Sequence, residues 1–167
     1  FMAVMLFVMS TAYADYGYSE VETPITYEQR TNIVTKFDDT SYNFTILLAD
    51  EYPLMEINNL AAVIGGSVEG GNTLVKDTVK ITYTKDERLA LYGDGRLMLE
   101  RVPVERDGKL FVPVSSLMPT LCYHIEFYRF GDPNTSDETP VIAITTGTNY
   151  PEITNTIYAK DFGAVGD

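Results

Sequence analysis

The chain has 167 residues, a formal net charge of −12 and a hydrophobic content of 45%. This length and composition suffice for one globular domain with tails, and they exclude a chain that is disordered throughout. The 24 acidic residues outnumber the 12 basic ones, which excludes a nucleic-acid partner and an anionic membrane surface, because both require clustered Lys and Arg. The acidity favours a role in solubility over calcium binding, since no acidic loop has the spacing of calcium ligands.

The amino terminus is typical of an export signal. Residues 2–9 form an uninterrupted apolar run that is too short to span a bilayer. Ala12 and Ala14 are small residues of the kind that signal peptidase accepts, so we expect residues 1–14 to be a signal peptide cleaved before Asp15. The chain opens without a start Met or a charged segment, from which we expect a truncated amino end. The expected location is secreted or cell-surface, with no membrane contact after cleavage.

The first elements follow a polar lead-in. We expect the lead-in over residues 15–41 and a first strand over 42–49. Pro53 permits a helix to start, and apolar residues at helical spacing predict a helix over 54–64. Gly65-Gly66 would end this helix, because glycine tolerates the left-handed conformation that follows a helix.

Strand patterns dominate the rest of the chain. Alternating or apolar runs predict strands over residues 78–84, 89–92, 97–104, 110–112, 122–130 and 141–145. Asp107-Gly108 predicts a hairpin turn, since both residues accept a positive φ. A short helix is predicted over 114–121, although Pro119 interrupts it. Residues 131–139 are expected to be a polar loop, and residues 147–156 a linker.

A weak internal repeat relates two parts of the chain, residues 52–68 and residues 112–125. Each part has a proline in a strand, then a short helix and a further strand. When Pro53 is aligned with Pro113, the spacings to the helix ends differ by a few residues. Duplication is therefore a hypothesis at this level.

Residues Asp107–Val114, with Leu117, carry a turn followed by a Val-Pro pair. Residues Leu60–Val68 carry the end of an apolar helix followed by Gly-Gly. This pattern resembles the copper amine oxidase-like N-terminal domain family. The resemblance covers about residues 42–146 and implies a hairpin that feeds a helix packed on a twisted antiparallel sheet. The chain departs from the family at Ser115, where members often carry Arg, and at Cys122, where the second helix lacks a terminal Gly. Modules of this family generally lack the copper site.

The last residues carry a second pattern, over Ile157–Asp167. The Asp-Phe-Gly-Ala-Val-Gly-Asp of this segment is similar to the opening of the pectate lyase superfamily, whose members are right-handed parallel β-helix enzymes and tailspikes. The glycines allow a tight turn, and Asp161 and Asp167 would hydrogen-bond turn amides, which is a structural role. The resemblance implies that the β-helix coils and their catalytic carboxylates follow in a longer chain.

No catalytic, cofactor-binding or metal-ligating constellation is present in the sequence. With one cysteine and one histidine, the chain has no internal disulfide and lacks the usual zinc and copper ligand sets. We expect Cys122 to be a buried apolar thiol and His124 to be non-catalytic. Tyr123 and Phe127 share one strand face and Tyr128 lies on the other, so either set is a candidate sugar platform, with core packing as the favoured account.

These observations predict an α+β fold with a mostly antiparallel sheet and one or two short helices, followed by the start of a parallel β-helix. We expect a non-catalytic accessory domain of a secreted bacterial polysaccharide-degrading enzyme, similar to pectate lyases or polygalacturonases. The chain would be the amino-terminal fragment of that enzyme, a glycoside hydrolase or polysaccharide lyase. Expected partners are polysaccharide or cell wall and the downstream β-helix, and no cofactor is expected.

Two alternatives stay open at the level of sequence. One is an envelope-binding adhesin whose β-helix is a non-catalytic stalk, and the other is a free-standing module. The sequence beyond Asp167 separates the three hypotheses. Paired Asp residues on neighbouring coils favour the enzyme, their absence favours the stalk, and a stop codon favours the free-standing module.

Overall fold

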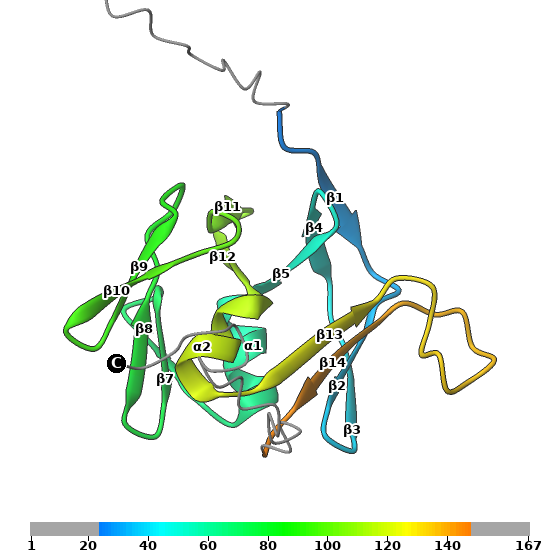
Figure 1. The fold of residues 1–167 in the computed structure, drawn as a ribbon. Helices are drawn as coiled ribbons and strands as arrows, with labels where there is room; N and C mark the ends of the chain where they lie inside the picture. Colours follow the sequence, from blue (N-terminus) through cyan, green and yellow to red (C-terminus); the bar gives the residue numbers. More distant parts are fainter. Residues whose placement is uncertain (1–23, 148–167) are drawn as a thin grey trace, which may run out of the picture.

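Short strands separated by tight turns make up most of residues 24–147, the part of the chain that the computed structural model describes (Figure 1). Almost every neighbouring pair of strands is antiparallel, and two short helices accompany them. The mostly antiparallel pairing and the short helices are therefore confirmed, but the strands form three sheets where the sequence predicted one. The predicted signal peptide and the predicted start of a β-helix over 157–167 lie outside the described residues.

The central sheet has five antiparallel strands in the order β1-β4-β5-β12-β11. Its strands are β1 (Tyr27–Arg30), β4 (Ile46–Ala49), β5 (Tyr52–Glu56), β12 (Lys109–Pro113) and β11 (Val104–Arg106). The sheet curls until its edges approach, since the Arg106 guanidinium of β11 lies 5.6 Å from the centre of the Tyr27 ring on β1. The predicted Asp107-Gly108 turn joins β11 to β12, with φ of 51° and 71°.

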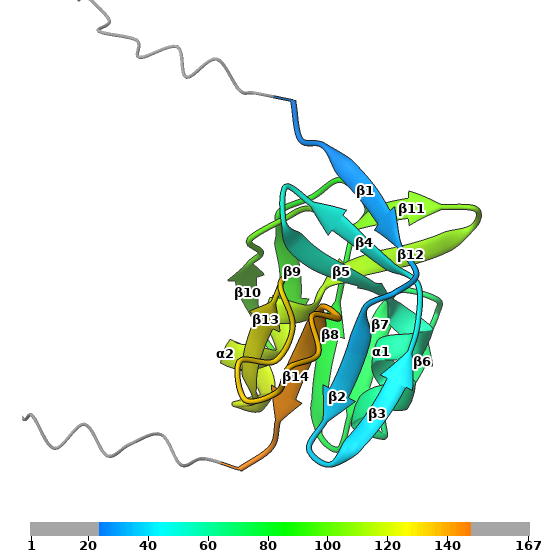
Figure 2. The same cartoon turned by 90° about the vertical axis from the view of Figure 1, so that its right-hand side faces the viewer.

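Two further sheets flank the helices in Figure 1, one on the left and one on the right. The meander sheet consists of β6 (Ser67–Glu69), β7 (Thr73–Lys76), β8 (Val79–Thr82), β9 (Leu89–Tyr92) and β10 (Gly95–Met98), each antiparallel to the next. The mixed sheet has the order β13-β14-β2-β3, with β13 (His124–Tyr128), β14 (Val141–Thr145), β2 (Val34–Phe37) and β3 (Thr40–Asn43). Within it, β14 and β2 run parallel, and Figure 2 shows them side by side.

The helical segments lie in the main core. They are α1 (Ile57–Ile64), the short 3-10 turn η1 (Val114–Ser116) and α2 (Leu117–Leu121). Leu60 and Leu117 have no exposed surface, and a hydrogen bond of 2.7 Å links the buried Tyr83 hydroxyl to Ser116 Oγ. No helix of the described residues is long and apolar enough to cross a membrane.

The antiparallel pairing of β5 with β12 joins two units of the chain that share the same order of elements. Met55 lies opposite Val112 at the centre of this antiparallel pair. Strand β5 leads into α1, and β12 leads into η1 and α2. Both helical segments end in a residue of left-handed conformation, Gly65 with φ 65° and Cys122 with φ 56°. Each unit then continues into a hairpin, β6-β7 in one and β13-β14 in the other.

The internal repeat is thus present in the fold, in a register that the sequence predicted only in part. The two helix ends correspond, since Gly65 and Cys122 occupy the same place after their helical segments. Because the spans from Glu56 to Gly65 and from Pro113 to Cys122 have equal length, Glu56 is the counterpart of Pro113. Pro53 is not, since it lies within β5 and pairs with β4.

Several predicted boundaries differ from those of the structure. The strand expected over 42–49 is divided between β3 and β4, and the one expected over 97–104 between β10 and β11. The helix expected over 54–64 starts only at Ile57, because pairing with β4 and β12 keeps the preceding residues in β5. The lead-in expected over 15–41 contains β1 and β2, which have four residues each and are stabilised by pairing with β4 and β14.

Cys122 is exposed, so the prediction of a buried thiol was wrong. The residue caps α2, where the chain turns away from the core and the side chain faces outward. We predict that Cys122→Gly raises the free energy of unfolding by about 0.5–1 kcal/mol, because glycine adopts this left-handed conformation without strain. Urea denaturation measures the change. Cys122→Ala keeps the Cβ and loses the thiol, so a Gly variant no more stable than the Ala variant would contradict the account.

Candidate functional site

The two units of the fold differ in the loop of the hairpin that follows the helical segment. A tight turn joins β6 to β7, whereas residues 129–140 join β13 to β14. This long loop lies beyond the mixed sheet at the right of Figure 1. Long polar loops on a rigid scaffold commonly carry function, so we place the candidate site at this loop.

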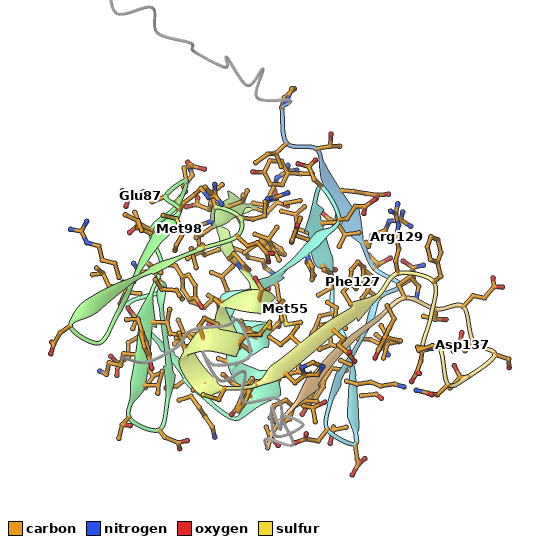
Figure 3. The ribbon with its side chains drawn as sticks, viewed as in Figure 1. Met55, Glu87, Met98, Phe127, Arg129 and Asp137 are labelled. Atoms are coloured by element: carbon orange, nitrogen blue, oxygen red, sulfur yellow. The ribbon has the colours of Figure 1, made fainter. Side chains whose placement is uncertain are left out.

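Local hydrogen bonds fold the loop back on itself. Asp132 Oδ1 accepts the backbone N–H of Asn134 at 2.9 Å, and Asp137 Oδ1 accepts that of Thr139 at 2.9 Å. Gly131 has φ 91°, and a Cβ on it would lie 2.0 Å from the carbonyl oxygen of Asp137. The loop therefore has a defined shape although it contributes little to the core. Figure 3 shows Asp137 at the right, far from the core residue Met55.

A polar hollow of about 320 Å³ lies between this loop and the outer face of the mixed sheet. It is lined by Val34, Lys36, Ser41, Asn43, Asp132, Thr135, Asp137, Thr139 and Val141. The strand register explains why the sheet residues gather here, because Lys36 lies opposite Ser41 and Val34 opposite Asn43. Lys36 Nζ contacts Asp132 Oδ2 at 3.2 Å and so connects the sheet to the loop.

A second polar row adjoins the hollow on the edge strand β13. Its members are His124, Glu126 and Tyr128, which share one face of the strand. The Tyr128 hydroxyl donates to Glu126 Oε2, and His124 Nε2 lies 3.2 Å from Glu126 Oε1. Tyr128 lies opposite Val141, which lines the hollow, so the row and the hollow lie on the same face of the mixed sheet, on either side of β14.

The charges of this face are fixed by hydrogen bonds. The backbone N–H of Asn134, followed by Lys36, holds the pKa of Asp132 below its ordinary value. Thr139 lowers the pKa of Asp137 in the same way, and the Tyr128 hydroxyl lowers that of Glu126. The bond to Glu126 raises the pKa of Tyr128 to about 12. At neutral pH the face therefore presents ionised carboxylates as acceptors beside an ammonium donor and a protonated phenol.

The residues proposed from sequence as a sugar platform are divided between two faces. Phe127 lies on the inner face of β13 opposite the buried Ile142, and the Tyr123 ring packs edge-on against Phe37 at 5.8 Å. Both contribute to the core, which was the favoured account. Tyr128 alone of the three lies on the outer polar face. Asp161 and Asp167 lie outside the described residues.

Sequence reasoning missed the sheet half of the hollow. Lys36 lies in β2, and Ser41 and Asn43 lie in β3. Lys36 and Ser41 were expected to belong to the lead-in, and Asn43 to the first strand. They meet the loop only because β2 pairs with β14. No local pattern signals this long-range pairing. Among residues 24–147, no group of three or more His, Cys, Asp or Glu side chains is placed to hold a metal ion.

Comparisons with protein-family models, with curated proteins and with solved structures found no match for this chain. The two resemblances that the sequence suggested therefore stay predictions.

We predict that Gly131→Ala lowers the free energy of unfolding by about 1–3 kcal/mol, because it adds backbone strain and a clash with the Asp137 carbonyl. Gly93→Ala is the matched control, since Gly93 also has a positive φ (56°) but no atom within 4 Å of the added Cβ. Thermal denaturation of both variants measures the difference. Equal losses would show that residues 131 and 137 are not in close contact.

We also predict that the loop loosens at acid pH. Asp132 and Asp137 have lowered pKa values in the folded state, so their stabilisation is complete above the ordinary Asp pKa of about 3.9 and is lost as the pH falls through the lowered values. NMR should show the amide signals of Asn134 and Thr139 moving in that acid range. The variant Asp137→Asn cannot ionise, so its Thr139 amide should lose this transition while Asn134 keeps it.

Proposed function

We propose that this chain is a non-catalytic, exported accessory module of a polysaccharide-active protein, and that the polar hollow is its saccharide-binding site. The observation that carries the proposal is the lining of the hollow, which combines donors and acceptors on a rigid sheet and a hydrogen-bonded loop. Sugar hydroxyls both donate and accept, so they suit a surface of this mixed kind. The resemblance of Ile157–Asp167 to the opening of β-helix polysaccharide enzymes supports the same reading.

The geometry is suited to binding rather than to catalysis. Asp132 Oδ1 already accepts two bonds from Asn134, one from its backbone N–H and one from its side-chain amide. Asp132 Oδ2 accepts one bond, from Lys36, and so keeps a further lone pair for a ligand hydroxyl. These bonds hold the carboxylate ionised and in place. A carboxylate kept ionised in this way serves as an acceptor and not as a general acid, which needs a raised pKa.

Titration of the isotope-labelled chain with a panel of neutral and acidic oligosaccharides tests the proposal by NMR. We expect at least one saccharide to shift the amide signals of Asn43, Asn134 and Thr139. Lys36→Ala should weaken that binding about tenfold, because it removes a donor and releases Asp132.

Lys80→Ala is the matched control, since it breaks an exposed ion pair with Glu69 on the distant meander sheet. It should leave saccharide binding unchanged. Equal affinities of the Lys36 and Lys80 variants, or shifts confined to residues outside the hollow, would contradict the proposed site. The absence of binding by every saccharide would contradict the proposed function itself.

A further inference from the structure

A second pocket lies on the opposite face of the mixed sheet from the polar hollow. Its volume is about 280 Å³, and Ile33, Leu48 and Phe127 form its apolar floor. Ile33 and Phe127 belong to the inner side of the mixed sheet, and Leu48 belongs to β4 of the central sheet; all three contact the main core. The main core therefore opens to the surface here, between the two sheets, and we call this opening the inter-sheet pocket.

Two arginines line the inter-sheet pocket, one from each sheet. Arg30 is the last residue of β1, and Arg129 follows the last residue of β13. Glu28 contacts Arg30 only at Nε, at 2.8 Å, and Glu51 contacts Arg129 only at one terminal nitrogen. Because a guanidinium has several N–H donors arranged in a fork, both arginines keep donors for a ligand.

The charge of the inter-sheet pocket is positive although the chain as a whole is acidic. Neither Glu28 nor Glu51 lines the pocket. Both ion pairs are exposed to solvent, and exposed pairs of this kind contribute little to stability. A ligand carboxylate can therefore compete with the two glutamates for Arg30 and Arg129.

An exposed aromatic ring lies at the same opening. Phe130 lines the pocket, yet its exposed fraction is 83%. Single exposed hydrophobic residues are ordinary on protein surfaces, but this ring stands beside an apolar floor, and the Arg129 guanidinium lies 5.7 Å from its centre. The pocket thus offers an apolar surface directly next to a cation.

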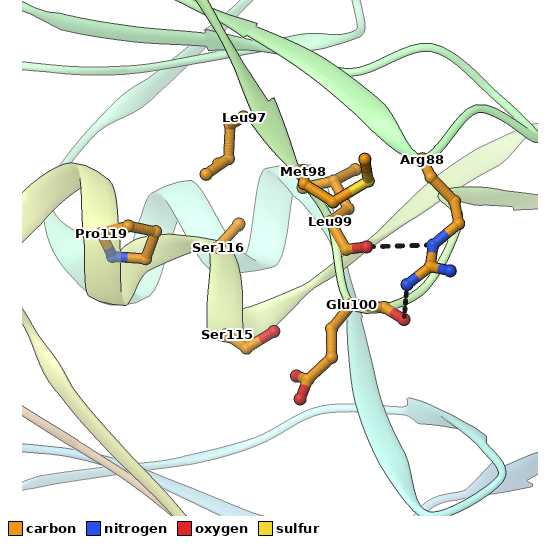
Figure 4. A pocket seen from close by; sticks show the side chains of 8 residues that line it. All are labelled: Arg88, Leu97, Met98, Leu99, Glu100, Ser115, Ser116 and Pro119. Atoms are coloured by element: carbon orange, nitrogen blue, oxygen red, sulfur yellow. Dashed lines mark hydrogen bonds between the residues drawn. The ribbon is translucent and has the colours of Figure 1, made fainter.

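The hollow of about 300 Å³ beside β10, shown in Figure 4, differs in how its arginine is used. Arg88 donates to the carbonyls of Leu99 and Glu100 at 3.2 and 3.3 Å, as the dashed lines in Figure 4 show. These bonds hold the chain that follows β10. The Glu100 side chain also lines that hollow and offsets the charge of Arg88. Of the two pockets, the inter-sheet pocket is the one suited to an anion.

We propose that the inter-sheet pocket binds a small carboxylic acid with an aromatic body. The carboxylate pairs with Arg30 and Arg129, because the planar guanidinium fork matches the geometry of a carboxylate. The aromatic body occupies the floor and packs against Phe130. The volume is at the lower end of the range for ligand pockets, roughly 300–1,000 Å³, so the ligand is small.

The ligand class of this pocket differs from that of the polar hollow. A saccharide does not suit the apolar floor, because its hydroxyls would lose their hydrogen bonds to water there. The inference therefore does not rest on the proposed saccharide-binding function.

Titration of the isotope-labelled chain with 3-phenylpropionate tests the inference by NMR. We expect the methyl signals of Ile33 and Leu48 to shift, with a dissociation constant on the order of a millimolar. The amide 3-phenylpropanamide has nearly the same shape without the charge, so it should bind about tenfold more weakly or worse. This comparison needs no substitution. Equal affinities of acid and amide would overturn the inference, as would the absence of shifts at Ile33 and Leu48.

Two variants separate the contribution of the charge from that of the aromatic body. Arg129→Gln should weaken binding of the acid about tenfold and leave binding of the amide nearly unchanged. Phe130→Ser should weaken both by a similar factor, since the ring contacts the part that the two ligands share. Arg96→Gln, which removes an exposed arginine on β10, is the matched control and should change neither.

Circular dichroism of each variant shows that the fold is retained. Acid binding by Arg129→Gln as strong as that of the unaltered chain would overturn the proposed role of the guanidinium. Shifts confined to Asn134 and Thr139 would place the acid in the polar hollow and would overturn the inter-sheet site, whereas the saccharide titration above tests the polar hollow independently.

Discussion

The antiparallel pairing of β5 with β12 is the constraint on which the rest of the structure depends. It joins segments that are far apart in the chain, and its central residues Met55 and Val112 have no exposed surface. Each strand runs directly into a helical segment, so the pairing also sets where α1 and α2 enter the core. Both helices, and the hairpins that follow them, take their positions from this single contact between strands.

The two units built on this pairing have been completed in different ways. Strands β8, β9 and β10 extend the β6-β7 hairpin into the meander sheet. Strands β2 and β3, from the amino-terminal part, extend the β13-β14 hairpin into the mixed sheet. The second unit also has the long loop over residues 129–140. The polar hollow exists because these two additions meet, with Lys36 on the sheet side and Asp132 on the loop side. Strand β10, which forms an open edge of the meander sheet, likewise belongs to the added strands β8–β10 and not to the strand, helix and hairpin that the two units share.

The sequence predicted elements well where a local pattern was strong. Strands over 89–92 and 141–145 have the predicted bounds, because both are apolar or alternating runs that turn residues delimit. Leu54 was assigned to a helix because its spacing to Ile57 is helical, yet pairing with Pro113 keeps it in β5. Tertiary pairing overrode periodicity at this position. Strands β1 and β2 were missed because they have only four residues each, with stability that comes from their neighbours.

The sequence by itself determined the class of fold, the hairpin turn at Asp107-Gly108, the ends of the two helices and the lack of a histidine or cysteine cluster. These features depend on single residues or on short periodic runs, which act locally. Only the tertiary structure decided which strands lie side by side, and therefore that Lys36 meets Asp132 and that Met98 lies on an open edge. The physical reason is that strand order depends on long-range pairing, in which the energy of a contact comes from a partner that the local sequence does not specify.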